Sequence, residues 1–449
     1  MKIKILIDHV SREINFAVKL KKYIESNELG FVAICHQDYI NNIVDYDFFK
    51  STFDGDYDII ITPSYNVVRT PEILLRTVAA RAKLVVYHSE QIFNDQYISE
   101  KLNTGNSLEY DKHVTAHLVW GDFFAEKLVR YSKIKPEKIY IVGNYKFDFI
   151  IPNESINGRV LLASDYKVGD LSDDDMRKFS EEYRVNLPEN LNRVVNQARK
   201  DALDWFENAA LSYPGITFCL RPHPGESTKL YKKLSYLGNV EISDMSRSYA
   251  DDLLRSDVIF GYTSTSVLEI LKANKKFYSL KTVDSDLSYL SIHSELLTWI
   301  SKEEFFEVLD KIAKHEVIRP STVDYNKINN IVEPYSDVTS NVVCALTNIN
   351  NASFTTTLSF RDLLRLKIAF FIGTGKFLAI KMSNSFPKLT FSEKIKMYSQ
   401  DSYCKRLESA EIIDSSIIDN EFDKIENCRY VQSSLVANQY GWKFESNEN

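Results

Sequence analysis

The chain has 449 residues, 44% of them hydrophobic and 26% charged, which is the composition of an ordinary globular protein. This length predicts at least two domains, and the formal net charge of −7 argues against nucleic acid as the main partner. Five cysteines without a CxxC pair give neither a disulfide framework nor a zinc-ligand pattern, so we expect a cytoplasmic protein. The N-terminus lacks the features of a signal peptide, and no run of 18 uncharged apolar residues is present to span a membrane.

Short apolar runs alternate with helical patterns through residues 1–150. Strands are predicted at 2–8, 31–36, 57–63, 83–89, 117–121 and 138–144, with helices at 11–28 and 122–131. The runs are too continuously apolar for half-exposed antiparallel strands. Their alternation with helices predicts a parallel, doubly wound α/β sheet.

The same pattern restarts after a polar linker at 151–158. Strands are predicted at 159–164, 216–221, 239–243, 257–262 and 276–280, with helices at 190–212, 248–255 and 266–274. We therefore expect an N-terminal Rossmann-like domain (1–150), a second Rossmann-like domain (159–335) and a basic helical tail (336–449). Two such domains facing a cleft form the layout of a GT-B glycosyltransferase, in which ligands lie beyond the carboxyl ends of the strands.

A stiff turn follows the strand at 216–221, in the sequence Arg221-Pro222-His223-Pro224-Gly225. The two prolines restrict the backbone and remove two hydrogen-bond donors, which orients the imidazole at little entropic cost. This places His223 at the expected ligand crevice. Taken alone, the turn is as well explained by a rigid bend with an incidental histidine.

A run of hydroxyl residues follows the strand at 257–262. Thr263, Ser264, Thr265 and Ser266 precede a predicted helix, whose free backbone N–H groups and dipole attract anions. Ser266 and Glu269 also fit a capping box, which needs only local hydrogen bonds, but that motif does not account for four hydroxyls. Together with the His223 turn, this run favours a phosphate-bearing ligand.

The segments "RPHPGE" and "DVIFGYTSTSVLEIL" resemble the His-Pro and serine motifs of bacterial GT-B glycosyltransferases that build capsule, O-antigen and other surface polysaccharides. The resemblance is to transferases that use CMP-sialic acid or CMP-Kdo, with a related pair in CDP-glycerol transferases. The segment at 117–150 is similar to the "WG…VVGNPRFD" stretch of surface carbohydrate biosynthesis proteins, with Tyr145 replacing the proline. The resemblance covers most of residues 1–290.

The resemblance implies that the second domain binds the nucleotide-sugar donor. His223, with Pro224, and the hydroxyl run at Thr263, Ser264, Thr265 and Ser266 would hold the nucleotide phosphate. Arg221 either adds charge there or pairs structurally. Glu269 either meets the ribose hydroxyls or completes its helix cap. No metal or other cofactor is expected.

Sugar transfer commonly needs a base for the acceptor hydroxyl, which would come from the first domain. Glu90 follows a predicted buried strand, near His88, without an evident capping role, and is the favoured candidate. The alternatives, Asp8 and Glu13, follow the first strand, and His9 and Arg12 are further candidate site residues in the same segment. Ser11 as a helix cap and Glu13 as a complement to the helix dipole would explain part of that loop without catalysis.

The tail contains a basic, apolar segment at 358–391 with no acidic residue after Asp362. It is too interrupted by charge to span a bilayer, but it suits an in-plane position on the cytoplasmic face of the inner membrane. The alternative is that this segment crosses back and packs on the first domain.

The leading interpretation is therefore a metal-independent glycosyltransferase, inverting or retaining. It would transfer Kdo or a sialic-acid-like sugar from a CMP-linked donor to a surface-glycan or lipid-linked acceptor. Other interpretations stay open. They are a CDP-glycerol or UDP-sugar transferase, a sugar-nucleotide epimerase, and a non-catalytic subunit of a polysaccharide assembly complex.

Overall fold

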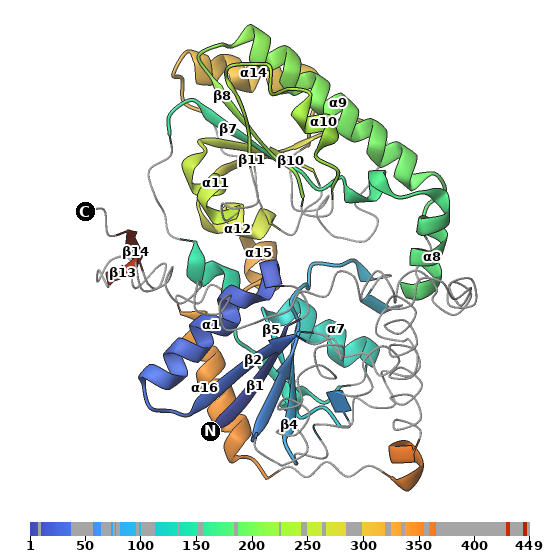
Figure 1. The fold of residues 1–449 in the computed structure, drawn as a ribbon, viewed down its shortest axis with the longest axis vertical. Coiled ribbons are helices and arrows are strands. Elements are labelled where there is room, and N and C mark those ends of the chain that lie inside the picture. The colour runs from blue at the N-terminus through green and yellow to red at the C-terminus, as the bar shows by residue number, and fades with distance from the viewer. Residues whose placement is uncertain are drawn as a thin grey trace, which may run out of the picture.

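The computed structural model describes most of two α/β domains. The described residues are 1–7, 10–36, 57–63, 73–74, 77, 81–95, 98–99, 113–132, 134–150, 156–183, 187–223, 226–243, 249–262, 266–283, 299–318, 325–333, 337–353, 359–364, 428–431 and 443–446. Each domain is built on a six-stranded sheet, and the two domains stack along the long axis of the molecule (Figure 1).

The first sheet is parallel, with the strand order β2-β1-β3-β4-β5-β6. Its strands are β1 (Lys2–Ile7), β2 (Phe31–His36), β3 (Ile59–Thr62), β4 (Lys83–Tyr87), β5 (Ala116–Val119) and β6 (Ile139–Ile141). Every residue of β3 and β5 is buried, because helices α1 (Val10–Ser26) and α7 (Asp122–Ser132) flank the sheet from opposite sides. Burial on both faces explains the unbroken apolar runs.

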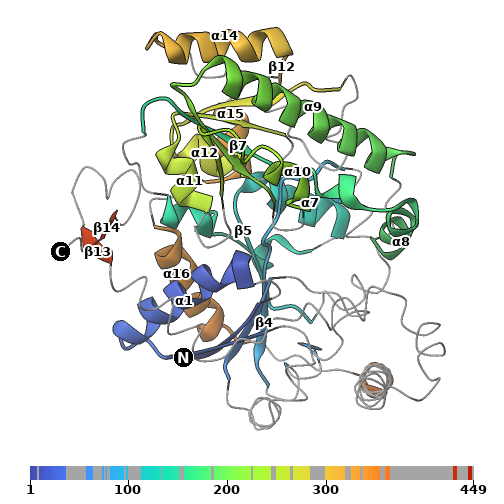
Figure 2. The same ribbon diagram turned by 45° about the horizontal axis from the view of Figure 1, so that its top comes forward.

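The second sheet is also parallel, in the order β12-β11-β10-β7-β8-β9. Its strands are β7 (Arg159–Ala163), β8 (Thr217–Arg221), β9 (Val240–Ile242), β10 (Val258–Gly261), β11 (Lys276–Leu280) and β12 (Trp299–Ile300). Helices α9 (Leu191–Ser212) and α14 (Lys302–Ala313) lie on the side away from the first domain (Figure 2). Helices α11 (Tyr249–Arg255) and α12 (Val267–Lys272) lie on the side towards it. The predicted GT-B-like α/β architecture is confirmed.

The remaining described elements are short or lie at the ends of the domains. They are α8 (Asp173–Tyr183), α10 (Lys229–Lys232), the 3₁₀ turns η1 (Pro136–Lys138), η2 (Tyr145–Phe149) and η3 (Lys167–Asp170), and the antiparallel pair β13 (Cys428–Val431) and β14 (Lys443–Ser446). Each described helix is too short or too polar to serve as a bilayer span.

The chain returns to the first domain after α14. Helix α15 (Tyr325–Ile331) lies so close to the start of α7 that a Cβ atom at Gly121 would be 2.7 Å from the Ile331 carbonyl oxygen. Helix α16 (Val338–Asn351) packs against α1 and supplies apolar side chains to the same core. Both helices therefore complete the first domain from the far end of the sequence.

A buried carboxylate fixes that return. Asp148, in η2, accepts hydrogen bonds from the backbone N–H groups of Val338 and Thr339, both at 2.9 Å, and lies 3.3 Å from the Lys19 ammonium group. On the neighbouring surface, the Lys83 ammonium group donates to the carbonyl of Ile349 at 2.8 Å. The segment that packs back is thus 338–351. Of the basic segment at 358–391, only residues 359–364 are described, with Phe360 and Leu364 exposed.

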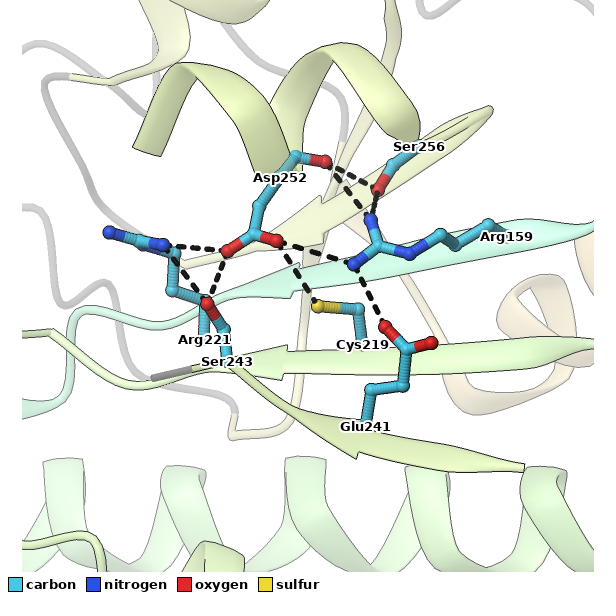
Figure 3. A network of polar contacts seen from close by, with 7 residues as sticks. All are labelled: Arg159, Cys219, Arg221, Glu241, Ser243, Asp252 and Ser256. Carbon is cyan, nitrogen blue, oxygen red and sulfur yellow. Dashed lines mark hydrogen bonds and ion pairs between the residues drawn. The ribbon is translucent and has the colours of Figure 1, made fainter. Parts of the chain in front are cut away.

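A second buried carboxylate organises the other domain. Asp252, on α11, is fully buried between two guanidinium groups, with Arg221 at 2.6 Å and Arg159 at 3.3 Å (Figure 3). Arg159 begins β7 and Arg221 ends β8, so one anion ties opposite ends of two neighbouring strands to the helix that covers them. Burial alone would raise the pKa of Asp252, but hydrogen bonds from Ser243 and Arg221 and the two positive charges hold it below its ordinary value.

We predict that Asp252→Ala lowers the free energy of unfolding by about 3–5 kcal/mol, because removing one partner of a buried ion pair leaves the other charge uncompensated. Urea denaturation of the full chain measures this loss. The matched control is Asp251→Ala, an exposed neighbour on the same helix, for which we expect a change within about 0.5 kcal/mol. Equal losses for the two variants would contradict the role assigned to Asp252.

Candidate active site

The strand order of the second sheet predicts where its ligand lies. Strands β7 and β10 are neighbours, and the chain continues outward from them in opposite directions, so they form the topological switch point. Ligands of open α/β sheets bind beyond the carboxyl ends of the strands at such a point. The residues that follow β7, β8 and β10 therefore form the candidate site.

Asp165 and His223 occupy this position. Asp165 follows β7, His223 follows β8, and the His223 Nε2 atom lies 4.0 Å from the Asp165 Oδ1 atom. That separation is too long for a hydrogen bond, but an oxygen atom of a ligand could lie about 2.8 Å from both. The Asp165 side chain is 16% exposed, and its Oδ1 atom has no hydrogen-bond partner among the described residues. An unsatisfied, buried acceptor beside an imidazole is typical of a ligand site.

The surroundings of Asp165 and His223 shift both pKa values so that the neutral form of each side chain is favoured. Burial raises the pKa of Asp165 to about 6; the Lys167 ammonium group opposes this, and the charges of Glu226 and Glu90 add to it. Burial, with the nearby Lys167 charge, lowers the pKa of His223 to about 4, against the opposing effect of Glu90. Near pH 7 the imidazole is therefore neutral, with one nitrogen that donates and one that accepts. Asp165 can exchange a proton close to neutral pH.

Glu90 approaches this pair from the first domain, since its charge acts on both Asp165 and His223. It lies in the loop after β4, and the neighbouring residue Gln91 stabilises this loop. The Gln91 side chain accepts a hydrogen bond from the Trp120 N–H at 2.9 Å and donates one to the His88 carbonyl at 2.8 Å. His88 itself contacts His117, with 3.1 Å between ring nitrogens. The structure thus places Glu90 and His223, both predicted from the sequence, within electrostatic reach of each other.

Other predicted residues have structural partners. Arg221 donates hydrogen bonds to Asp252 and Ser243. These contacts favour a structural pairing for Arg221 over a role in binding the phosphate. The predicted capping box at Ser266 is wrong: Ser266 has a helical backbone conformation and its side chain makes no cap hydrogen bond. Glu269 instead forms an ion pair across the domains with Lys146, at 3.0 Å.

Several predicted residues cannot be placed. Asp8, His9, Pro224, Thr263, Ser264 and Thr265 lie outside the described residues, and Arg12 lies on α1 without a described side chain. Glu13, also on α1, is buried. Within the described ranges, no three histidine, cysteine or acidic side chains lie close enough together to bind a metal ion. The roles of these residues, and the expected lack of a cofactor, stay predictions.

The sequence analysis missed Asp165 and Lys167. The signal was present: Asp165 comes directly after the buried run "RVLLAS", in the same relation to its strand as Glu90 has to β4. The rule that polar residues just beyond buried parallel strands form ligand sites identifies both residues when it is applied to every strand.

Comparisons with known proteins give matches at the level of solved structures. No protein-family model and no curated protein matches the chain. The chain is similar to the UDP-GlcNAc 2-epimerase of Neisseria meningitidis bound to UDP-GlcNAc (13% identity, TM-score 0.48, 78% of this chain and 100% of that one). It is similar to the UDP-GlcNAc 2-epimerase of Methanocaldococcus jannaschii in complex with UDP-GlcNAc and UDP (13%, 0.49, 78% and 100%). A glycosyltransferase from Rickettsia africae also matches (12%, 0.40, 78% and 99%).

These matches correct the leading functional interpretation, transfer of an acidic sugar from a CMP-linked donor. The nucleotides named in these structures are UDP and UDP-GlcNAc, and two of the three proteins are epimerases. The sugar-nucleotide epimerase, which the sequence analysis left open as an alternative, agrees better with them. At such low identity the likeness concerns the fold, so the chemistry of this chain has to be argued from its own residues.

Proposed function

We propose that the chain is an enzyme that acts on a nucleotide sugar, and that it epimerises a UDP-linked sugar. The observation that carries this proposal is the Asp165 carboxyl, with a pKa of about 6 and a buried Oδ1 atom that makes no hydrogen bond among the described residues, beside His223 and within reach of the Glu90 charge. Inversion at C2 of a UDP-linked sugar can proceed by removal of the C2 proton as the C1–O bond breaks, which leaves a C1–C2 double bond and free UDP; UDP then adds back to C1 as a proton is delivered to the opposite face of C2. This chemistry needs acid and base groups on the enzyme but no acceptor molecule.

Asp165 and Glu90 supply two carboxyl groups from opposite domains. A group that titrates near the working pH both takes and gives a proton efficiently. Asp165 fits that requirement, and Glu90 approaches the same place from the other side of the interface. In this proposal the two carboxyl groups serve the two faces of the sugar.

His223 and Lys167 suit the diphosphate of such a substrate. The neutral imidazole donates one N–H bond, and the Lys167 ammonium group, 3.9 Å from Asp165, supplies positive charge at the same edge of the sheet. Both follow neighbouring strands of the second sheet, β7 and β8, at the edge where ligands of such sheets bind. UDP is the first nucleotide to test, because structures of similar fold contain it.

Nucleotide binding provides the first test. We expect UDP and UDP-GlcNAc to raise the melting temperature of the full chain, and CMP and GDP at equal concentration to have much smaller effects. His223→Asn should weaken the UDP response at least tenfold in apparent affinity. His315→Asn is the matched control; this histidine lies far along the sequence, after α14, at a positive φ of 55° that asparagine tolerates. Stabilisation by CMP but not by UDP would contradict the proposal.

Exchange of a carbon-bound proton provides the second test. In D₂O without any acceptor, the wild-type chain should convert UDP-GlcNAc to its 2-epimer with deuterium at the inverted carbon, followed by ¹H NMR. Asp165→Asn and Glu90→Gln should each lower kcat at least 100-fold while UDP still binds, because each substitution removes an acid–base group and keeps the shape.

The outcome also separates the rival enzyme class. A transferase would leave the sugar proton unexchanged and release UDP only when an acceptor is added. Unchanged kcat in both carboxyl variants would contradict the assigned acid–base roles.

A further inference from the structure

Glu226 lies three residues after His223. Its side chain contacts the segment after β7 that carries Asp165. Its side chain is 7% exposed, and its carboxylate lies 2.8 and 2.9 Å from the Ser164 hydroxyl oxygen. The same carboxylate accepts from the backbone N–H of Tyr166 at 2.5 Å and from the Tyr231 hydroxyl. All these partners can donate, which matches the ionised form of the carboxyl group.

These contacts fix Asp165 from both sides. Ser164 and Tyr166 are its neighbours in the chain, so the Glu226 carboxylate holds the side chain of the residue before it and the backbone N–H of the residue after it. The backbone of Glu226 holds the other partner, because its N–H donates to the His223 carbonyl at 2.8 Å and closes the turn. One residue thus joins the loop after β7 to the loop after β8.

Glu226 also acts on Asp165 through its charge. The charged groups that face Asp165 are Lys167 on its own loop, Glu226 from the β8 loop and Glu90 from the first domain, with His223 opposite. Burial contributes most to the raised pKa of Asp165, Lys167 lowers it, and Glu226 and Glu90 raise it. Burial raises the pKa of Glu226 itself, while hydrogen bonds from Tyr231, Ser164 and Tyr166 and the Arg199 charge oppose that shift.

We propose that Glu226 is a positioning residue of the active site: its hydrogen bonds to Ser164, Tyr166 and the His223 turn set the separation of Asp165 and His223, and its carboxylate adds negative charge beside Asp165. This inference rests on the proposed function for its catalytic consequence. Its structural and electrostatic part stands on the contacts of Glu226 alone.

Glu226→Gln is the decisive variant, because it keeps the size and most hydrogen bonds but removes the charge. We expect kcat for the UDP-sugar to fall at least tenfold with KM changed less than threefold. The pH profile of kcat/KM should shift to lower pH, since removing the negative charge lowers the pKa of Asp165.

Two controls separate this role from simple anchoring of the loop. Ser164→Ala removes one hydrogen-bond donor to the Glu226 carboxylate and changes no charge. Tyr231→Phe removes one donor to Glu226 without changing its charge. Neither control should shift the pH profile. If Glu226→Gln lowers the free energy of unfolding as much as the control variants do, and its pH profile of kcat/KM does not shift, Glu226 only anchors the loop.

A second measurement needs no activity. Because the folded-state pKa of Asp165 is raised, its contribution to the free energy of unfolding is lost as pH rises from about 4 to about 6. Asp165→Asn should therefore become more stable relative to the wild type across this window, measured by urea denaturation at each pH. In the Glu226→Gln background the same difference should shrink.

The two measurements distinguish the possible failures. A wild-type chain without UDP-sugar activity would overturn the proposed function, and the stability series would still decide the inference about Glu226. An Asp165→Asn difference of equal size in both backgrounds would overturn that inference.

Discussion

The second domain depends on one anion in its interior, the carboxylate of Asp252. Strands β7 and β8 each carry an arginine at one end, and neither guanidinium group could be buried without a counter-charge. Asp252 supplies it from α11, so the helix, the two strands and the loop beyond β8 have fixed relative positions. The turn that carries His223 begins at Arg221, so the ion pair with Asp252 also fixes the start of this turn. The Arg221 carbonyl accepts a further hydrogen bond from the Ser164 N–H at 3.0 Å. The site is thus stiff on the side of the second domain.

The interface between the domains has a different character. Lys146 of η2 pairs with Glu269 of α12, and Lys272 of the same helix lies over the Phe147 ring, 5.5 Å from its centroid. Beside these polar contacts, one hydrophobic cluster contains residues of both domains, among them Phe147 and Ile150 of the first and Val267 and Leu268 of the second. The proposed acid–base groups, Glu90 and Asp165, come from both sides of this interface, so the distance between them follows the relative position of the domains. A ligand that bridges Glu90 and Asp165 would stabilise one such position.

The architecture could be predicted from the sequence, because a strand that is buried on both faces of a sheet consists of an unbroken run of apolar residues. The sequence singled out His223 and Glu90 as candidates for a related reason: polar residues after such runs lie at the edge where parallel strands end. It did not resolve the role of Arg221, because the partner Asp252 is 31 residues away and only the folded α11 brings it near. It also misjudged Glu269, since the local capping pattern predicted a partner at Ser266 and the actual partner, Lys146, belongs to the other domain. Pairings across elements are set by tertiary packing and leave no local pattern.

The return of α15 and α16 to the first domain has a consequence for how the chain is made. The buried carboxylate of Asp148 bonds to a backbone N–H 190 residues later, and the apolar side chains of α16 belong to the core around α1. During synthesis the first sheet leaves the ribosome long before the helix that completes it, whereas the second sheet and α14 emerge with all their partners. The second domain can therefore fold while the face of α1 that receives α16 is still uncovered. Completion of the first domain is the late step, and it waits until the chain has been made as far as α16.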